Sequence, residues 1–423
     1  MKLFVYLLII YDIHTTFIIM EYISRPTYIE KIKPFINKQI IKVLTGQRRV
    51  GKSYVMYQLM DVVKESDPEA NIIYVNRELE NFLWIHDYTD LLKHVNEQLT
   101  EKKKNYLFID EVQDISSFQL ALRSLFAENK CDIFCTGSNA NMLSGELATY
   151  LGGRYIEFPI HGLSYKEFLI FHQLTDSYES LTKYLTYGGM PYLVNIGLTN
   201  EHPFEYLKSI YSTILLKDVV ARENIRNISF LENLVCFLSD NIGSLFSASN
   251  ISKFLKSQRI DISPQLTLNY LKALGNAFFI YKVNRADIVG LKLFEIGEKY
   301  YFEDLGIRNA IKGFNLRSDI HKIMENAVFL HLIQEGFNVY FGKSGDKEID
   351  FIGEKNGSKI YVQVTLQITN EETEKREFGN LLAINDNYPK YVVTLNDLIV
   401  GSDYKGIKQF NLNDFLQRDL NKN

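Results

Sequence analysis

The feature that most constrains this chain is the stretch IIKVLTGQRRVGKS at residues 40–53. Its apolar first part, residues 40–44, predicts a short strand that is buried on both faces. Gly46 ends this run, and the sequence Gly-Lys-Ser at residues 51–53 then opens a helix. Glycine, four residues and Gly-Lys-Ser between a strand and a helix form the pattern of a phosphate-binding P-loop. The stretch therefore predicts an α/β sheet with a phosphate site at its edge.

The chemistry of such a loop assigns expected roles to its residues. Phosphates need several backbone N–H groups that converge on them, and a helix N-terminus adds unpaired donors and a positive dipole end. Lys52 is expected to reach the β- and γ-phosphates of ATP, and the Ser53 hydroxyl is expected to ligate Mg²⁺. Arg48 and Arg49 add positive charge, either for the nucleotide or for a nearby carboxylate. The expected nucleotide-binding residues are thus Gly46, Gln47, Arg48, Arg49, Val50, Gly51, Lys52, Ser53 and Tyr54, and the alternative is a chance glycine turn before a helix.

A second stretch, residues 105–113 (NYLFIDEVQ), predicts a buried strand that ends in two acids. Asp110 at the strand end is expected to hold Mg²⁺, largely through water, opposite Ser53. Glu111 is placed to orient and activate an attacking water. An acidic pair after a strand is also common as a solvated turn, so the prediction depends on the P-loop upstream.

Two more polar sites lie next to predicted strands. Residues 132–139 (DIFCTGSN) predict a strand that ends in Ser138 and Asn139, at the edge where α/β sheets bind ligands. Arg154 precedes a further predicted strand, residues 155–158. It is either an arginine finger that acts on a neighbouring subunit or an ordinary structural arginine. For Ser138 and Asn139 the alternative is a turn with structural duties alone.

Beyond residue 160 the pattern becomes helical, and residues 161–240 are predicted to form a helical lid or linker. Residues 249–255 and 263–274 then predict two short helices, followed by strands at 278–283 and 292–296, which together suggest a winged helix. Basic residues outnumber acids there: Lys253, Lys256, Arg259, Lys272, Lys282, Arg285 and Lys292. DNA is therefore an alternative partner, although the predicted recognition helix carries one lysine and no arginine.

The last segment predicts a helix at 318–334, three strands at 339–341, 348–352 and 360–364, a helix at 371–384 and a strand at 391–394. This order resembles nucleases with a restriction-endonuclease-like fold. Such an active site needs an Asp and then an Asp/Glu-x-Lys motif to hold Mg²⁺ and activate water. Asp350 and Glu325 supply carboxylates, but Gln363 and Thr365 stand where the second acid and the lysine belong. We therefore expect no DNA cleavage, unless Lys343, Lys347 or Lys359 takes the missing role.

Composition sets broad limits on the chain. Its 423 residues suggest two to four domains, and 46% hydrophobic and 23% charged residues with a net charge of −4 are typical of a soluble globular protein. Three cysteines without metal-ligand spacing fit a reducing cytoplasm. Residues 1–19 are apolar but interrupted by Asp12 and His14. They favour a start assigned too far upstream of Met20 or a disordered extension, with an anchor as the alternative and no membrane span expected.

With these residues in view, the chain from Met20 resembles the prokaryotic AAA-type ATPases that end in a nuclease-fold domain of unknown function. The resemblance rests on residues 46–53, 107–111, 136–139, 152–154, 188–191, 300–308 and 348–365. In such ATPases the sensor strand lies between the P-loop strand and the acidic strand, so the resemblance makes Ser138 or Asn139 a sensor of the γ-phosphate.

The resemblance implies an ATP-hydrolysing, Mg²⁺-dependent switch with catalytic residues Lys52, Glu111, Asn139 and Arg154, which acts on an unknown protein partner or as a homo-oligomer. The expected domains are a P-loop core (20–160), a helical lid (161–240), a winged helix (241–311) and an inactive restriction-endonuclease-like α/β domain (312–423).

Overall fold

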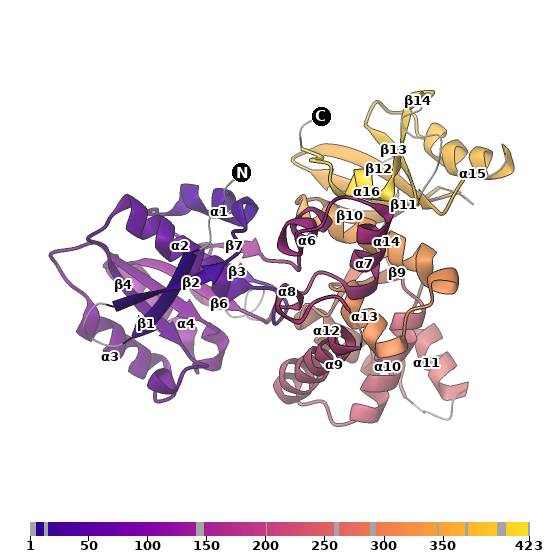
Figure 1. Cartoon of the computed structure of the whole chain (residues 1–423). Helices are drawn as coiled ribbons and strands as arrows, with labels where there is room; N and C mark the ends of the chain where they lie inside the picture. Colours follow the sequence, from indigo (N-terminus) through magenta and orange to yellow (C-terminus); the bar gives the residue numbers. More distant parts are fainter. Residues whose placement is uncertain are drawn as a thin grey trace. The chain divides into compact units, whose positions relative to one another are not determined.

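The computed structural model describes residues 6–11, 16–140, 148–199, 201–257, 262–287, 293–344, 347–368, 371–395 and 403–421. The chain divides into two compact units, Met1–Ile160 and His161–Asn423. Each unit has its own main sheet (Figure 1) and its own cluster of buried apolar side chains.

The first unit is a five-stranded parallel sheet between two layers of helices (Figure 1). Its elements in chain order are β1 (Tyr6–Tyr11), β2 (Thr16–Tyr22), α1 (Pro26–Ile32), η1 (Lys33–Phe35), β3 (Ile41–Thr45), α2 (Lys52–Ser66), β4 (Asn71–Asn76), η2 (Glu80–Phe82), α3 (Tyr88–Gln98), β5 (Asn105–Asp110), η3 (Val112–Asp114), α4 (Phe118–Glu128), β6 (Asp132–Gly137), α5 (Ala148–Leu151) and β7 (Tyr155–Pro159).

The strand order in this sheet is β4-β5-β6-β3-β7, with every pair parallel. The P-loop strand β3 is therefore next to β6, and β6 is next to the acidic strand β5, as the family resemblance implied. Because all five strands run the same way, their carboxyl ends meet at one edge. The loops after β3, β5 and β6 carry the predicted site residues, apart from Arg154, to that edge.

Successive side chains of a strand point to opposite faces of the sheet. On one face, the apolar side chains pack against α3 and α4. This core includes Val43, Ile73, Val75, Leu107 and Ile109, all fully buried. Buried side chains on α2, among them Val55, Leu59 and Val63, belong to the helical layer formed by α1 and α2 (Figure 1). A sheet covered on both faces explains why its strands read as continuous apolar runs.

Strands β1 and β2 pair antiparallel as a separate two-stranded sheet. The residues that the sequence predicted as a mis-assigned start or a disordered extension thus include paired strands.

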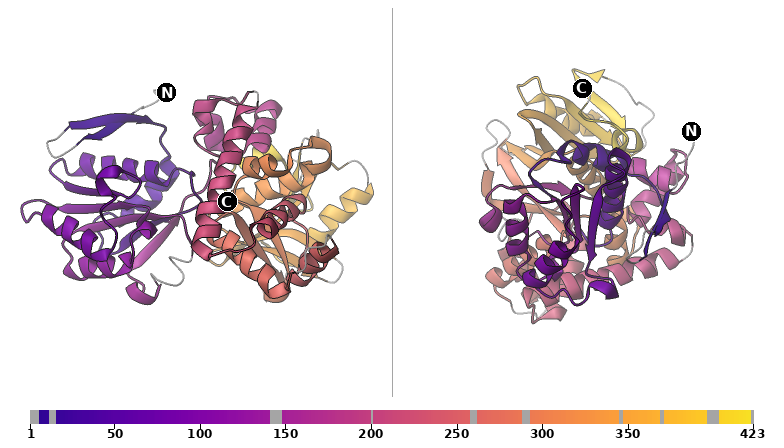
Figure 2. Two further views of the ribbon diagram at one scale, coloured as in Figure 1. Left: turned by 90° about the horizontal axis from the view of Figure 1, so that it is seen from below. Right: turned by 90° about the vertical axis from the view of Figure 1, so that its left-hand side faces the viewer.

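The second unit combines helices with an eight-stranded mixed sheet (Figure 2). Its elements are α6 (Tyr165–Phe171), α7 (Tyr178–Tyr187), α8 (Leu193–Ile196), α9 (His202–Thr213), the π-helix η5 (Ile214–Ala221), α10 (Ile228–Asp240), α11 (Ala248–Ser257), α12 (Pro264–Asn276), β8 (Ile280–Asp287), β9 (Leu293–Phe302), α13 (Leu305–Lys312), α14 (Leu316–Gln334), β10 (Asn338–Ser344), β11 (Lys347–Lys355), β12 (Ser358–Thr365), α15 (Glu371–Leu382), β13 (Lys390–Thr394), β14 (Asp403–Tyr404), β15 (Ile407–Asn411) and α16 (Leu412–Leu416).

The strand order of this sheet is β14-β15-β13-β12-β11-β10-β8-β9. Helices α11 and α12 pack on each other, and β8 and β9 form an antiparallel hairpin, which are the parts expected of a winged helix. However, β8 also pairs in parallel with β10. The domain boundary expected between residues 311 and 312 therefore falls within one continuous sheet, because the strands before it (β8 and β9) and after it (β10 to β15) belong to that sheet.

Two glycines in this unit allow a very close approach between α7 and α13. A Cβ on Gly306 would lie 1.9 Å from the Tyr187 carbonyl oxygen, and one on Gly188 would lie 2.5 Å from an Asp304 carboxylate oxygen. Since real side chains do not tolerate such distances, both positions require glycine. These contacts account for the glycines within residues 188–191 and 300–308, two of the stretches on which the family resemblance rests.

Candidate nucleotide site

The P-loop connects β3 to α2 and depends on two glycines in conformations that other residues avoid. Gly46 has φ +145°, and a Cβ there would lie 2.0 Å from the carbonyl oxygen of Ile160. Gly51, with φ 96° and ψ 24°, is left-handed and caps the N-terminus of α2. The glycine pattern is thus explained by loop geometry and by the close approach of the chain after β7.

Lys52 is the best-placed cation of this loop. Its side chain is 3% exposed, and its Nζ donates to the carbonyl oxygens of Gly46 and Gln47, 3.1 Å away in each case. The same Nζ lies 3.6 Å from Oε1 of Glu111. The loop therefore holds the ammonium at the carboxyl edge of the sheet, beside the acidic strand.

Asp110 ends β5 and is buried among hydroxyl groups. Its Oδ1 accepts a hydrogen bond from Thr136 Oγ1 at 2.5 Å, and the Ser53 hydroxyl also hydrogen-bonds to the carboxylate. Burial and the neighbouring charge of Glu111 raise the pKa of Asp110, against the lowering effects of these hydroxyls and of Lys52. The two residues predicted to hold Mg²⁺, Ser53 and Asp110, are thus in contact.

Glu111 takes a left-handed conformation, with φ 52° and ψ 51°, which turns its side chain back toward the P-loop. Its backbone N–H donates to Thr136 Oγ1 at 2.9 Å, and its Oε2 accepts from Ser138 Oγ at 3.1 Å and from Gln113. Burial alone would raise the pKa of Glu111, but the positive charges of Lys52 and Arg48 and these hydrogen bonds lower it to about 2. The carboxylate is therefore ionised at neutral pH and fixed from three sides.

The predicted sensor residues follow β6, between the other two strands. Ser138 is fully buried and touches Glu111 directly, whereas Asn139 is half-buried in the next position. Thr136, which sequence reasoning did not single out, bridges Asp110 and the Glu111 backbone from the same strand. Its position inside an apolar strand gave no separate signal.

The remaining predicted loop residues differ in their surroundings. Arg48 is buried and pairs with Glu78 at 3.2 Å, which is one of the two alternatives given for it. Arg49 is exposed with φ 72°, and Val50 is fully buried. Tyr54 is 46% exposed. Gln47 is buried, and its Oε1 has no hydrogen-bond partner among the described residues.

Arg154 lies at the opposite edge of the sheet from the P-loop. Its carbonyl accepts from the N–H of Ile41, the first residue of β3, and its exposed guanidinium lies 5.7 Å from the ring centre of Phe126. A five-residue strand separates the two edges by about 13 Å at ~3.3 Å per residue. The Arg154 side chain therefore does not reach the P-loop of its own chain.

Arg25 is a further residue that sequence reasoning missed. It is 2% exposed, its Nη1 donates to the carbonyl oxygen of Val50 at 2.9 Å, and its backbone N–H donates to Gln58 Oε1 at 2.9 Å. Its guanidinium also stacks 4.6 Å from the ring centre of Tyr28. Arg25 thus ties the P-loop and α2 to the chain ahead of α1.

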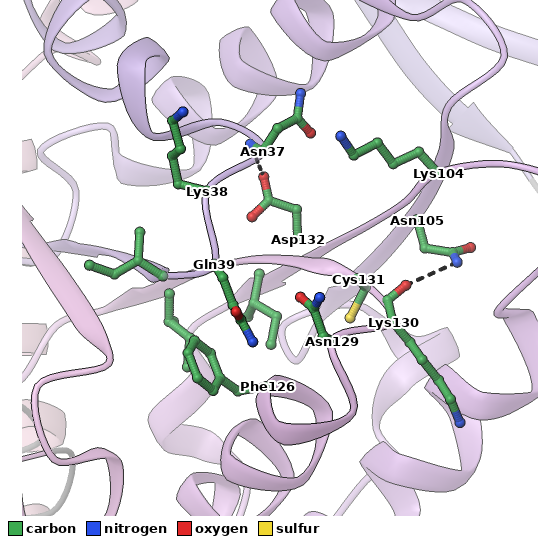
Figure 3. Close-up of a pocket in the computed structure, with 13 residues that line it drawn as sticks. Asn37, Lys38, Gln39, Lys104, Asn105, Phe126, Asn129, Lys130, Cys131 and Asp132 are labelled. Carbon is green, nitrogen blue, oxygen red and sulfur yellow. Dashed lines mark hydrogen bonds between the residues drawn. The ribbon is translucent and has the colours of Figure 1, made fainter.

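A separate cavity of about 290 Å³ opens at the amino-terminal edge of the same sheet, away from these residues (Figure 3). Asp132 beneath it forms a buried pair with Lys42 and accepts from the N–H of Asn37 at 2.7 Å. Asn105 donates to the Lys130 carbonyl oxygen at 3.1 Å. None of the predicted site residues lines this cavity.

In the second unit, the predicted nuclease-like residues come together only in part. Asp350 and Gln363 are adjacent, since the N–H of Asp350 donates to Gln363 Oε1 at 3.4 Å. Thr365 is buried at the end of β12. Lys359 lies over the ring of Tyr388, 6.0 Å from its centre, and the side chains of Lys343 and Lys347 lie outside the described residues.

The glycine loop, the buried lysine and the position of β6 between β3 and β5 define the first unit as a P-loop domain of AAA type. In agreement, the family model "AAA domain" matches residues 38–169. Two further models, both described as domains of unknown function (DUF8612 and DUF4143), match residues 178–318 and 321–414.

The chain belongs to the same family as an uncharacterized protein of Haemophilus influenzae, to which it is 38% identical over 383 residues. The match covers 88% of this chain and 93% of that protein. An uncharacterized protein of Methanocaldococcus jannaschii is 32% identical over 388 residues, which cover 87% of this chain and 84% of the relative.

Among solved structures, the chain is similar to the Aeropyrum pernix ORC1 protein in complex with DNA, with 11% identity, 68% and 92% coverage and a TM-score of 0.32. It is also similar to AMPPCP-bound DnaA from Aquifex aeolicus, with 16% identity, 51% and 75% coverage and a TM-score of 0.30. Scores this low support no conclusion about the partners of this chain. Within the described residues, no helix has the length and apolar character needed to cross a membrane.

Proposed function

We propose that this chain binds ATP with Mg²⁺ and hydrolyses it, and that its nucleotide state controls a partner. One observation carries the proposal: a P-loop lysine and two strand-end carboxylates meet at the carboxyl edge of a single sheet. Lys52 Nζ lies 3.6 Å from Glu111, and Asp110 contacts the Ser53 hydroxyl.

The residues present fit both the nucleotide and the metal ion. The N–H groups of residues 46–53 and the Lys52 ammonium would hold the phosphates, and Ser53 with Asp110 would hold Mg²⁺. When bound, Mg²⁺ supplies positive charge that balances the charge developing on the phosphate oxygens. The Oε1 atom of buried Gln47 has no hydrogen-bond partner among the described residues, so it is a polar group that a bound ligand could contact.

Glu111 is proposed to orient the attacking water. A pKa of about 2 makes its carboxylate a weak base, so its main role is to accept a hydrogen bond from the water and fix its direction. Ser138 and Gln113 hold the carboxylate in place from the other side. Asn139 is proposed as the sensor that contacts the γ-phosphate, and Arg154 as a finger that acts on the site of a neighbouring copy.

The nucleotide state could reach the second unit through two adjacent residues. Ile160 ends the first unit: its N–H donates to Thr45 at 2.7 Å, and its carbonyl oxygen lies close to Gly46 of the P-loop. His161 begins the second unit, and Glu303 accepts from its Nδ1 at 3.1 Å and from the N–H of Gly162 at 3.1 Å. A shift of the P-loop would therefore displace Ile160, which is covalently bonded to His161, and His161 is held by Glu303.

A nucleotide-binding measurement tests the proposal. Lys52→Ala should abolish binding of a fluorescent ATP analogue in an anisotropy titration, because the main phosphate cation is lost. Lys93→Ala removes an exposed lysine of α3 and serves as the matched control. Equal affinity of Lys52→Ala and wild-type protein would refute the site.

DNA binding is a second candidate function, favoured by the exposed lysines on the helix pair α11–α12. Lys253, Lys256 and Lys272 are all exposed there, whereas Lys282 of the hairpin pairs with Glu298. Phosphate contacts should make binding steeply salt-dependent. If an anisotropy titration at low salt shows no binding, or if replacing the three lysines by alanine leaves binding unchanged, protein docking remains as the function of this region.

For the C-terminal segment we propose a restriction-endonuclease-like fold without nuclease activity. The order α14, antiparallel β10–β11–β12, α15 and parallel β13 supports the fold. The neutral side chains of Gln363 and Thr365 support the missing activity, because a hard cation prefers carboxylates and cleavage needs a nearby positive charge.

A further inference from the structure

The strongest unexplained feature of the second unit is a group of charged side chains from four elements. Lys299 of β9 lies 3.3 Å from Glu325 of α14 and 2.8 Å from Glu348 of β11. Asp350, also on β11, interacts electrostatically with Lys299 and Glu325. Glu377 of α15 adds negative charge near Asp350. One ammonium therefore faces three acidic side chains, with a fourth near Asp350. Glu325 and Asp350 stand where a nuclease of this fold would hold its metal.

Neighbouring groups fix this cluster tightly. Tyr301 donates to Glu325 Oε1 at 2.5 Å, and Asp350 Oδ2 accepts from the N–H of Val364 at 2.8 Å. Gly243 approaches so closely that a Cβ there would lie 2.7 Å from Glu325 Oε1. The carboxylates are thus committed to protein donors on several sides.

Charge also distinguishes this cluster from an open metal site. Burial alone would lower the pKa of Lys299, but Glu325, Asp350 and Glu348 raise it above its usual value, so the ammonium stays charged at every physiological pH. Burial and the charge of Glu325 raise the pKa of Asp350 to about 8, against the effect of Lys299. The positive charge of the lysine is therefore permanent.

The residues do not fit the metal that the proposed fold implies. Across the described part of the chain, no group of three or more His, Cys, Asp or Glu side chains is placed to hold a metal ion. The side chains of Lys299, Glu325 and Asp350 are buried, at 3%, 5% and 9% exposure of each residue. A DNA backbone needs access to the catalytic groups, and among these acids only Glu348, with its side chain 40% exposed, reaches the surface.

We propose that the Lys299 ammonium takes the place of the metal ion in this nuclease-like cluster. It neutralises Glu325 and Glu348 directly, and no divalent cation binds there. The same ion pairs attach the β8–β9 hairpin to α14 and β11, so the cluster joins two parts of the chain instead of cleaving a phosphodiester. The inference does not depend on the ATPase proposal.

Divalent-cation binding tests this proposal in the full-length chain without nucleotide. All variants carry Asp110→Asn, so that the P-loop does not contribute a cation site. Free Mn²⁺ is followed by electron paramagnetic resonance during titration. With Lys299 present, Asp350→Asn should not change Mn²⁺ binding. A stoichiometric site that disappears on Asp350→Asn would overturn the proposal, as would Mn²⁺-dependent nicking of a supercoiled plasmid that needs Asp350.

The removal of the lysine gives the converse test. Lys299→Ala leaves the carboxylates without their cation, so the variant should gain about one Mn²⁺ site and a melting temperature that rises with added Mn²⁺. Adding Asp350→Asn should remove both gains. A folded Lys299→Ala variant that gains no Mn²⁺ site would overturn the proposal. If Lys299→Ala does not fold, the comparison of Mn²⁺ binding with and without Asp350→Asn in the Lys299-containing protein still tests the proposal.

Discussion

Arg25 offers a sharp test of how the P-loop is held in shape. The guanidinium is 2% exposed, donates to the Val50 carbonyl at 2.9 Å and stacks on Tyr28. A hydrogen bond from a charged donor contributes about 1.5–3 kcal/mol, and a cation–π contact adds about 0.5–1 kcal/mol. We therefore expect Arg25→Ala to destabilise the first unit by about 2–4 kcal/mol. In a unit of this size the melting temperature should fall by about 4–16 °C.

The effect on nucleotide binding separates a positioning role from a merely stabilising one. In Arg25→Ala the Val50 carbonyl loses its donor, so the loop should sample other shapes and the Kd for ATP should rise by about tenfold even well below the melting temperature. Arg25→Lys keeps the positive charge but lacks the planar, forked set of donors of arginine. Its Kd for ATP should therefore lie between those of the wild-type protein and Arg25→Ala. Lys31→Ala, which removes an exposed basic side chain on α1, is the control. A destabilised Arg25→Ala variant with wild-type Kd at low temperature would refute the positioning role, and an unchanged melting temperature would refute the energetic reasoning.

Four further outcomes are expected. Gly46→Ala should abolish ATP binding, because its Cβ would lie 2.0 Å from the Ile160 carbonyl oxygen; a wild-type affinity in the anisotropy titration would contradict this. Arg154→Ala mixed with Glu111→Gln should recover some ATPase activity if the arginine acts on a neighbouring copy, whereas no recovery at any ratio, with both variants folded and assembling, would count against it. Glu303→Gln should keep ATP affinity within about twofold but reduce the nucleotide-dependent change in hydrogen exchange at residues 161–164, and an undiminished change would rule out this route. Burial lowers the pKa of His331 from 6.5 to about 4, so the folded state resists protonation; stability should fall between pH 6.5 and 4 by up to about 3 kcal/mol, and His331→Phe should lessen this fall in denaturant titrations.

The sequence was sufficient to predict the sheet of the first unit and its site edge. A buried strand before a glycine loop and two strands that end in polar residues each give a local signal, and parallel packing brings them together. The position of β6 between β3 and β5 followed from the family resemblance and is confirmed by the pairing of the strands.

Other features escaped prediction because they depend on contacts between distant segments. Arg25 has no motif around it, and its role appears only when its guanidinium meets a carbonyl 25 residues away. Lys299 likewise stands in an ordinary strand, 26 residues from Glu325 in sequence. The sequence located candidate lysines near the nuclease-like strands and not on β9, because a strand pairing such as β8 with β10 leaves no local pattern.

The central claim is that Glu111 serves hydrolysis and not binding. The most direct measurement is phosphate release from ATP and Mg²⁺ by wild-type and Glu111→Gln protein at saturating nucleotide, with ATP affinity measured in parallel and Glu101→Gln as an exposed control. The account predicts slow but measurable wild-type turnover, retained ATP binding in Glu111→Gln, and a loss of turnover by about two or more orders of magnitude. Wild-type turnover in a Glu111→Gln variant that binds ATP normally would contradict it.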